Sequence, residues 1–165
     1  INSTQCKKNS EWKKLIANNQ HIKILYYNKT PVEGYQWFCN SIFNSRLGMP
    51  RPHNVVIPAL MHAVNIGFKE IYLAGVDHSW FTSLRVEQDN TVTMEHAHVY
   101  GITPTRFPIF AYLDEKRHLH DMLTKFANTF RSYFYIKDYA CYKQTKIYNI
   151  TEGSFIDAFE KRKLN

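Results

Sequence analysis

The chain has 165 residues with 44% hydrophobic content, enough to bury one substantial core, so we expect a single α/β domain over residues 1–165. The net charge of +7 comes from dispersed Lys and Arg residues without a nucleic-acid motif, which argues against a nucleic-acid partner and leaves a phosphate-bearing substrate, an anionic membrane surface or a solvated basic face. No run approaches 18 apolar residues, and three cysteines without CxxC spacing argue against a disulfide framework or a zinc knuckle.

The first third of the chain predicts two helices separated by a strand. Apolar spacing predicts a short helix over Glu11–Asn18, and the alternation in His21–Tyr26 predicts a strand. A second helix is expected over Tyr35–Leu47, ended by Gly48-Met49-Pro50. Four large apolar residues would form its inward face: Trp37, Phe38, Ile42 and Phe43.

The stretch from Asn54 to Trp80 is the most informative part of the sequence. Apolar residues at three- and four-residue spacing predict a helix from about Val56 that stops at Gly67. The apolar run that follows, ending at Ala74, predicts a buried parallel strand, and Gly75 allows a sharp turn or a close approach to a ligand. Ligands collect at the carboxyl ends of such strands, so we expect a site at Asp77-His78; the alternative is that Asp77 only caps the next segment.

Beyond Trp80 the pattern predicts an inserted hairpin and then a return to the parallel sheet. Ser83–Glu87 and Thr91–Glu95 are the expected hairpin strands, and a loop containing Pro104 and Pro108 follows them. A long helix is expected from about Leu113 and a second from Tyr133 to Tyr142, before a parallel strand over Lys146–Ile150. This order favours a Rossmann-like α/β fold whose mainly parallel sheet is flanked by helices.

Histidines supply the chemistry expected at the site. His96 and His98 would share one face of a strand, and His78 could converge with them. A metal centre of Asp77 with these histidines is one interpretation, but no strong ligand motif such as HExxH is present, so we expect no metal. The other is a single histidine acting as general base, and each histidine alone could also be structural.

Three segments resemble known families. NIGFKEIYLAGVDHSWF, from Asn65 to Phe81, resembles a segment of bacterial sialyltransferases of glycosyltransferase family 42, in which Lys-Glu-Ile-Tyr-Leu precedes Gly-Ile-Asp. EHAHVYG is similar to that family's His-Tyr-Ile-Gly-His segment. KIYNITEGSFIDAF resembles the domain family of motility-associated glycosyltransferases and 6-hydroxymethylpterin diphosphokinase-like proteins. The resemblance covers roughly Arg51 to Phe159.

The resemblance implies a glycosyltransferase-like protein of bacterial surface-glycan synthesis. Such a protein binds a nucleotide sugar, typically a CMP-activated nonulosonic acid, and transfers the sugar without a metal to a glycan or lipid-linked acceptor. The family's Gly-Asn-Gly-Pro-Ser nucleotide-binding turn is missing here, so the chain looks like the C-terminal part of such an enzyme. It would work in the bacterial cytoplasm, with peripheral association at the inner face of the membrane left open.

The resemblance also assigns roles to individual residues. The general base would be His98 or His96. Arg51 and Asn54 stand near the family's Arg-Ile-Thr-Ser-Gly segment and would contact the nucleotide phosphate. Ser79, Trp80 and Phe81 stand where the family has two tyrosines. The remaining substrate-binding residues would be Gly75, His78, Ser79 and Tyr100.

Two other classes of function stay open. A pyrophosphokinase would need magnesium held by carboxylates, and only Asp77 is well placed for that in this segment. A non-catalytic carbohydrate-binding or assembly module would use aromatic stacking surfaces such as Trp37, Trp80 and Tyr100.

Overall fold

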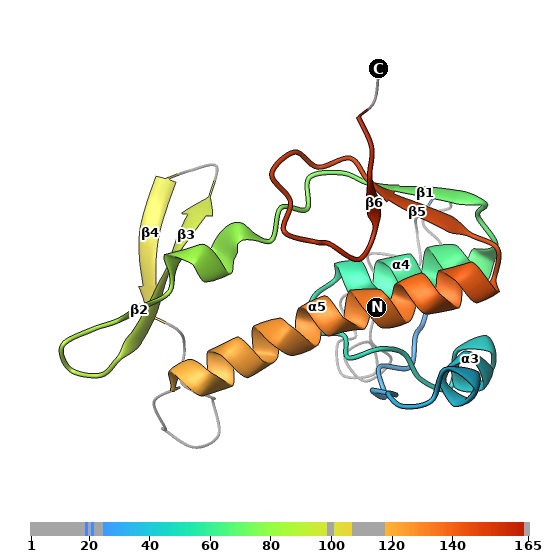
Figure 1. Ribbon diagram of the computed structural model, residues 1–165, viewed down its shortest axis with the longest axis horizontal. Helices are drawn as coiled ribbons and strands as arrows, with labels where there is room; N and C mark the ends of the chain where they lie inside the picture. The colour runs from blue at the N-terminus through green and yellow to red at the C-terminus, as the bar shows by residue number, and fades with distance from the viewer. Residues whose placement is uncertain (1–18, 20, 22–24, 99–100, 107–117, 164–165) are drawn as a thin grey trace.

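The computed structural model describes residues 19, 21, 25–98, 101–106 and 118–163. Two small sheets lie toward opposite ends of one long helix (Figure 1). The described helices are α3 (Gln36–Asn44), α4 (Val56–Ile66), the short 3-10 helix η1 (Ser79–Ser83) and α5 (Leu119–Tyr142). The first sheet contains β1 (Glu70–Leu73), β5 (Lys146–Asn149) and β6 (Glu160–Lys161), and the second contains β2 (Arg85–Val86), β3 (Val92–His98) and β4 (Gly101–Arg106).

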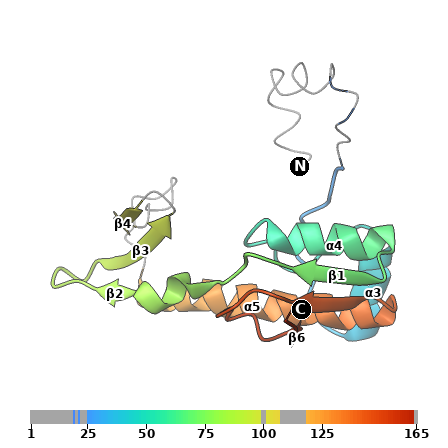
Figure 2. The ribbon, with the colours of Figure 1, turned by 90° about the horizontal axis from the view of Figure 1, so that it is seen from above.

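The first sheet is parallel, with strand order β1-β5-β6. Its central register pairs Ile71 with Ile147 and Leu73 with Asn149. The connection from β1 to β5 contains the second sheet and α5. The helices α4 and α5 run alongside the strands of the first sheet (Figure 2). The predicted α/β class, with a parallel sheet flanked by helices, is therefore confirmed, and so is the parallel strand that begins at Lys146.

The main hydrophobic core lies between the first sheet and its helices. Fully buried side chains of α4 meet fully buried side chains of α5 there, and Leu73 and Ile147 close the core from the sheet. The helix residues with no measurable exposure are Ile57, Val64, Tyr133, Ile136 and Tyr139. As predicted, α4 stops at Gly67, whose φ of 97° places it in the left-handed region where an L side chain would be strained.

The inward face of α3 agrees with the prediction only in part. Phe43 is buried, as predicted, and Ile42 is half-buried. Trp37 is 73% exposed and Phe38 is 41% exposed, and Cys39 is buried in their place. Cys39 and Phe43 are four residues apart and so share a helix face, while Trp37 points about 200° away from Cys39. Phe43 packs edge-on against Tyr139 of α5 with ring centroids 5.3 Å apart, and this contact orients the helix.

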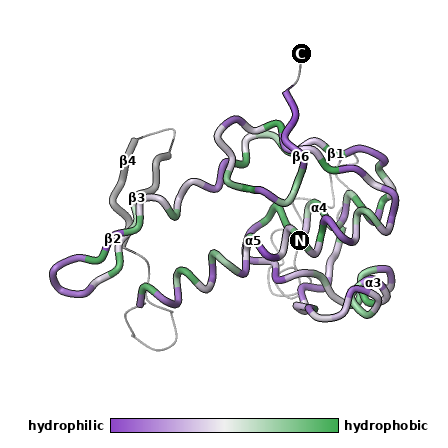
Figure 3. The backbone as a smooth tube through the Cα atoms, viewed as in Figure 1, coloured by the Kyte–Doolittle hydropathy of each residue, from purple (hydrophilic) through white to green (hydrophobic). Residues whose placement is uncertain are grey.

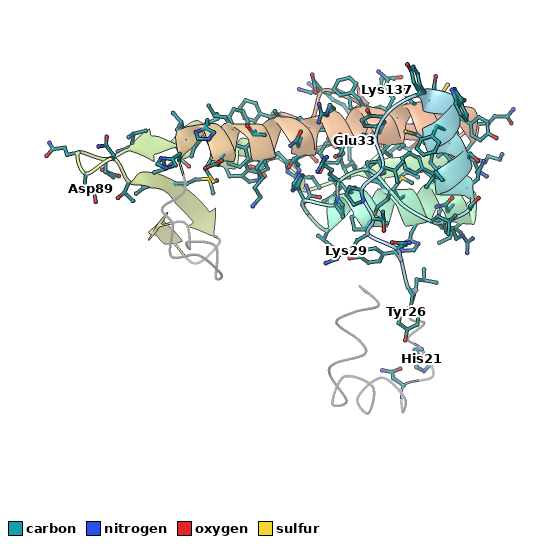
Figure 4. All side chains as sticks on the ribbon, turned by 90° about the horizontal axis from the view of Figure 1, so that it is seen from below. His21, Tyr26, Lys29, Glu33, Asp89 and Lys137 are labelled. Atoms are coloured by element: carbon teal, nitrogen blue, oxygen red, sulfur yellow. The ribbon has the colours of Figure 1, made fainter. Side chains whose placement is uncertain are left out.

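The second sheet is antiparallel and confirms the predicted hairpin. β2 pairs with β3 around the turn at residues 87–91, whose tip carries Asp89 (Figure 4). β4 pairs with β3 on the other side, and Pro104 stands opposite Glu95, so the expected loop around Pro104 is instead an edge strand. An edge strand tolerates proline because one side of its backbone needs no partner strand.

α5 is one continuous helix of 24 residues, about 36 Å long, where two helices were expected. It contains neither Gly nor Pro, so nothing in its sequence interrupts the hydrogen-bond ladder near Tyr133.

The expected helix at Glu11–Asn18 lies outside the described residues, as does most of the expected strand His21–Tyr26. Leu25 and Tyr26 are described, and both are exposed and outside any strand. None of the described helices has the length and apolar character needed to cross a bilayer.

Candidate functional site

Two loops interlock at the carboxyl ends of β1 and β5. The hydroxyl of Thr151 accepts a hydrogen bond from the Val76 N–H (3.1 Å) and donates one to the Leu73 carbonyl (3.2 Å). The hydroxyl of Ser154 donates to the Val76 carbonyl (2.7 Å), and the Phe155 N–H donates to the Asp77 carbonyl (2.8 Å). The loop after β1 is therefore fixed to the loop after β5 by both backbone and side-chain hydrogen bonds.

Asn149, the last residue of β5, organises the second of these loops. Its side chain is 1% exposed, and its amide nitrogen donates to the Ser154 hydroxyl (2.9 Å) and to the Ile156 carbonyl (3.2 Å). Its amide oxygen accepts from the Thr151 N–H (3.0 Å). Asn149 was not among the predicted site residues, and the available signal was a polar residue that follows Ile147 and Tyr148 at the end of the strand.

Asp77 is exposed at this edge, as the sequence predicted for the carboxyl end of β1. The Ser79 hydroxyl donates a hydrogen bond to its carboxylate, which lowers the pKa of Asp77 below its ordinary value. The carboxylate is therefore ionised at neutral pH and can accept hydrogen bonds from a ligand. Gly75 precedes it with φ of 70°, a conformation that a side chain would strain, so the turn requires glycine.

His78 does not have the exposed position expected of a substrate ligand. It is 7% exposed and is enclosed by the rings of Trp80, Phe130 and Tyr133. Its Nε2 lies 2.6 Å from the Tyr133 hydroxyl and 3.2 Å from the Asn54 amide nitrogen. Burial lowers the pKa of His78, so the ring is neutral near pH 7 and holds the Asp77 loop against α5 instead of contacting substrate.

The hydrogen bonds around His78 indicate one tautomer. The Asn54 amide can only donate from its nitrogen, both to His78 Nε2 and to the Tyr133 hydroxyl (3.0 Å). The Tyr133 hydroxyl can then donate to Nε2, which places the ring proton on Nδ1. Burial raises the pKa of Tyr133 to about 12, so this hydroxyl keeps its proton.

The side chain of Asn54 satisfies the first N–H groups of α4 and is therefore engaged within the protein. Its amide oxygen accepts the N–H groups of Val56 (3.0 Å) and Ile57 (3.1 Å). Because its nitrogen contacts His78 and Tyr133, one side chain joins α4, the β1 loop and α5. A direct contact of Asn54 with a nucleotide phosphate would break these bonds, so we revise its expected role to positioning.

Arg51 is likewise engaged within the protein. Its Nε donates to the Glu33 carboxylate (2.7 Å), and Arg131 contacts the second oxygen of the same carboxylate (3.3 Å). Figure 4 shows Glu33 close to α5. Arg51, which was predicted to contact the nucleotide phosphate, therefore already pairs with a carboxylate. This pairing joins the segment before α4 to α5.

The remaining predicted residues lie on or beyond β3. His96 pairs with Thr103 and His98 with Gly101 in the backbone register, which confirms the strand on which their shared face was predicted. Their side chains and Tyr100 lie outside the described part of the chain, so their convergence with Asp77 stays a prediction. Within the described part, no three His, Cys, Asp or Glu side chains gather as metal ligands would.

A cavity of about 630 Å³ opens at the carboxyl ends of β5 and β6. One wall is the turn that follows β5 and the other is the basic segment that follows β6. Its lining residues are Asn149, Ile150, Thr151, Glu152, Gly153, Lys161, Arg162 and Lys163. The hydrogen-bonded Thr151–Ser154 turn thus has the Asp77 loop on one side and a basic cavity beside it.

Comparisons with known proteins do not assign the chain to a family. No family model matches it, and searches of curated proteins and of solved structures gave no significant match.

Proposed function

We propose that this chain is part of a glycosyltransferase-like protein of bacterial surface-glycan synthesis, built on a Rossmann-like fold. It transfers a sugar, such as a sialic or related nonulosonic acid, from a nucleotide donor to a hydroxyl of a glycan or lipid-linked acceptor. The observation that carries the proposal is the joint edge formed by the Asp77 loop and the Thr151–Ser154 turn beside a basic cavity. In open α/β sheets this edge is where ligands bind.

The proposed chemistry assigns different roles to the residues of this edge. The ionised Asp77 accepts hydrogen bonds from hydroxyls of the donor sugar, with Ser79 fixing its orientation. An acceptor hydroxyl oxygen attacks the anomeric carbon, the bond from that carbon to the phosphate oxygen breaks, and the nucleotide leaves. His98, or His96, takes the proton from the attacking hydroxyl. His78, Asn54 and Tyr133 position the Asp77 loop.

The resemblance of Asn65–Phe81 to glycosyltransferase family 42 supports metal-free sugar transfer, because that family transfers sugars from nucleotide donors without a metal. Under this proposal the protein works in the bacterial cytoplasm, and at the inner face of the membrane where the acceptor is lipid-linked.

A donor panel tests the proposal. Calorimetry with CMP-, UDP- and GDP-sugars and with ATP, each with and without magnesium, is followed by detection of released nucleotide in the presence of a glycan acceptor. We expect one sugar nucleotide to bind without magnesium and to be consumed. Binding of ATP alone, with an absolute need for magnesium, would instead favour the pyrophosphokinase class.

Asp77→Asn tests the site itself. It removes the charge and keeps the shape, so sugar-nucleotide affinity or turnover should fall by about 10- to 100-fold, the value of one or two hydrogen bonds to a charged group. Asp138→Asn on the exposed face of α5 is the matched control and should change neither quantity. If affinity and turnover are the same in the two variants, Asp77 is not part of the binding site.

One observation keeps a carbohydrate-binding module as a second candidate. Trp37 is 73% exposed and lies beside the exposed Phe38, with ring centroids 6.0 Å apart, which leaves an aromatic surface available to a sugar. Trp80, by contrast, is packed against Phe126 and Phe130. Glycan binding abolished by Trp37→Ala, with no consumption of any sugar nucleotide, would select this candidate.

A further inference from the structure

The cavity after β5 and β6 has walls that are fixed to each other. Tyr148 pairs with Glu160 and Asn149 with Lys161 in parallel register, and the Arg162 N–H then donates to the Asn149 carbonyl (3.0 Å). Beyond this point the two segments separate, one into the Thr151–Ser154 turn and the other into Lys163. The volume of about 630 Å³ between them falls within the range of small-molecule sites.

The charges that line this cavity favour an anion. Lys161, Arg162 and Lys163 face a single acidic lining residue, Glu152. Arg162 is held against the sheet, with its guanidinium 4.7 Å from the centre of the Tyr148 ring. Lys161 and Lys163 are exposed, and no carboxylate of the described residues forms an ion pair with either. Figure 3 shows this segment after β6 as strongly hydrophilic.

The other cationic position expected to receive a phosphate is already occupied by the protein. Arg51 pairs with Glu33, and Asn54 accepts the first N–H groups of α4 that an anion would use. A phosphate at that position would have to displace both interactions, whereas at the cavity it would meet lysines without a carboxylate partner in the described part of the chain. Charge-assisted hydrogen bonds from lysine suit phosphate oxygens.

We infer that the cavity lined by Asn149–Gly153 and Lys161–Lys163 binds the phosphate group of a phosphorylated small molecule. For the identity of that molecule the inference rests on the proposed function: the phosphate is that of the nucleotide donor. The cavity then holds the leaving group while Asp77, on the other side of the shared loop network, holds the sugar.

A charge-matched pair of double variants tests the inference. Lys161→Gln/Lys163→Gln removes both lysines of the cavity, and Lys29→Gln/Lys69→Gln removes two exposed lysines elsewhere, of which Lys29 is labelled in Figure 4. The net charge is equal in the two proteins, so general electrostatic attraction is equal. Calorimetry with UDP, CMP, ribose 5-phosphate and inorganic pyrophosphate, and flotation with vesicles of anionic lipid, measure binding.

We expect the cavity variant to bind UDP or CMP at least about tenfold more weakly than the wild-type protein, and the control variant to bind within about twofold of it. The dependence of affinity on salt should also weaken in the cavity variant alone, since the lysine–phosphate contacts are lost. Nucleotide binding that is equal in the two variants would overturn the inference. So would a cavity variant that loses only vesicle binding, because the basic segment would then serve a membrane surface.

The same data separate this inference from the proposed function. If nucleotide binding depends on Lys161 and Lys163 but no sugar is ever transferred, the cavity assignment stands and the transferase proposal fails. If sugar is transferred and the cavity variant leaves the KM for the donor unchanged, the transferase proposal stands and the cavity assignment fails. Circular dichroism of both variants verifies that the substitutions leave the fold intact.

Discussion

Counted over the described side chains, the two ends of α5 contact hydrophobic clusters of very different size. The first cluster joins α3, α4, the C-terminal half of α5, β1, β5 and the segment around Ile156 into the main core. Among the side chains that the structure describes, the second contains four buried residues, namely Val92, Met94, Met122 and Phe126, with η1 packed against them. The Asp77 loop follows directly from the large cluster, whereas the strand that carries His96 and His98 belongs to the small one. In the proposed site, the Asp77 loop is therefore anchored by the large cluster, whereas the strand of His96 and His98 is anchored only by the small one.

The largest expected effect comes from opening a cavity in each cluster. Ile136→Ala in the large cluster should lower the free energy of unfolding by about 3 to 5 kcal/mol, because closely packed neighbours on all sides cannot collapse into the space. Met122→Ala in the small cluster should cost about 2 to 3 kcal/mol, since the partly exposed side chains packed against that cluster, Trp80 and Phe81, can relax into the space. Urea denaturation measures both.

Hydrogen exchange distinguishes the two cavity variants further. Met122→Ala should increase exchange in residues 79–98 and leave α4 protected, while Ile136→Ala should increase exchange throughout. A uniform increase in both variants would show that the two clusters unfold as one unit and would contradict the comparison.

A smaller effect is expected where the Asp77 loop is attached to α5. Tyr133→Phe keeps the ring but removes the hydroxyl that pairs with buried His78, so the protein should lose about 1 to 3 kcal/mol of stability. Tyr35→Phe, at an exposed position, is the control and should be neutral. The Tyr133 variant should also weaken donor binding, since the loop that holds Asp77 loses a contact. Unchanged stability would show that His78 needs no partner there.

The pH dependence of stability should depend on the same histidine. The pKa of His78 is lowered in the folded state by burial, so protonation favours the unfolded chain. Stability is therefore fully present above the unfolded-state pKa of about 6.5 and falls as the pH drops below it. His78→Asn, chosen because asparagine tolerates the left-handed backbone, should flatten the decline in the urea midpoint between pH 7.5 and 5.5. An unchanged slope would assign the decline to His53 and His62, whose pKa values burial also lowers.

The smallest effect is expected at Trp37, where the sequence suggested a core residue. Trp37→Ser should change the free energy of unfolding by less than about 0.5 kcal/mol, because the ring is exposed on the outer side of α3. Phe43→Ala on the buried face is the comparison and should cost about 3 to 5 kcal/mol. A large loss for Trp37→Ser would indicate that its ring packs against a part of the chain outside the described residues.

Elements with a clear local pattern were predictable from the sequence. The periodicity of α4, its stop at Gly67 and the alternation of the β2–β3 hairpin all depend on neighbours in the chain. The inward face of α3 was predictable only in part: Phe43 was expected there and is buried, but hydrophobicity also favoured Trp37, which is exposed. The contact of Phe43 with Tyr139, almost a hundred residues away, selects which face turns inward.

The same distinction applies to the candidate site. Asp77 could be placed at a strand end from its local sequence, since a short apolar run leads directly to it. The pairing of His78 with Tyr133, and of Arg51 with Glu33, could not, because each joins residues from separate elements. A motif would assign His78 and Arg51 to ligand binding, but His78 positions the Asp77 loop and Arg51 joins the segment before α4 to α5.

Hydrogen exchange with and without a saturating nucleotide tests the central claim most directly, namely that ligand binds at the joint carboxyl edge of β1, β5 and β6. We expect UDP or CMP to slow exchange in residues 149–155 and 161–163, and the matching sugar nucleotide to extend that protection to residues 75–79. Protection confined to residues 51–56, or absent from both loops while calorimetry reports binding, would contradict this account.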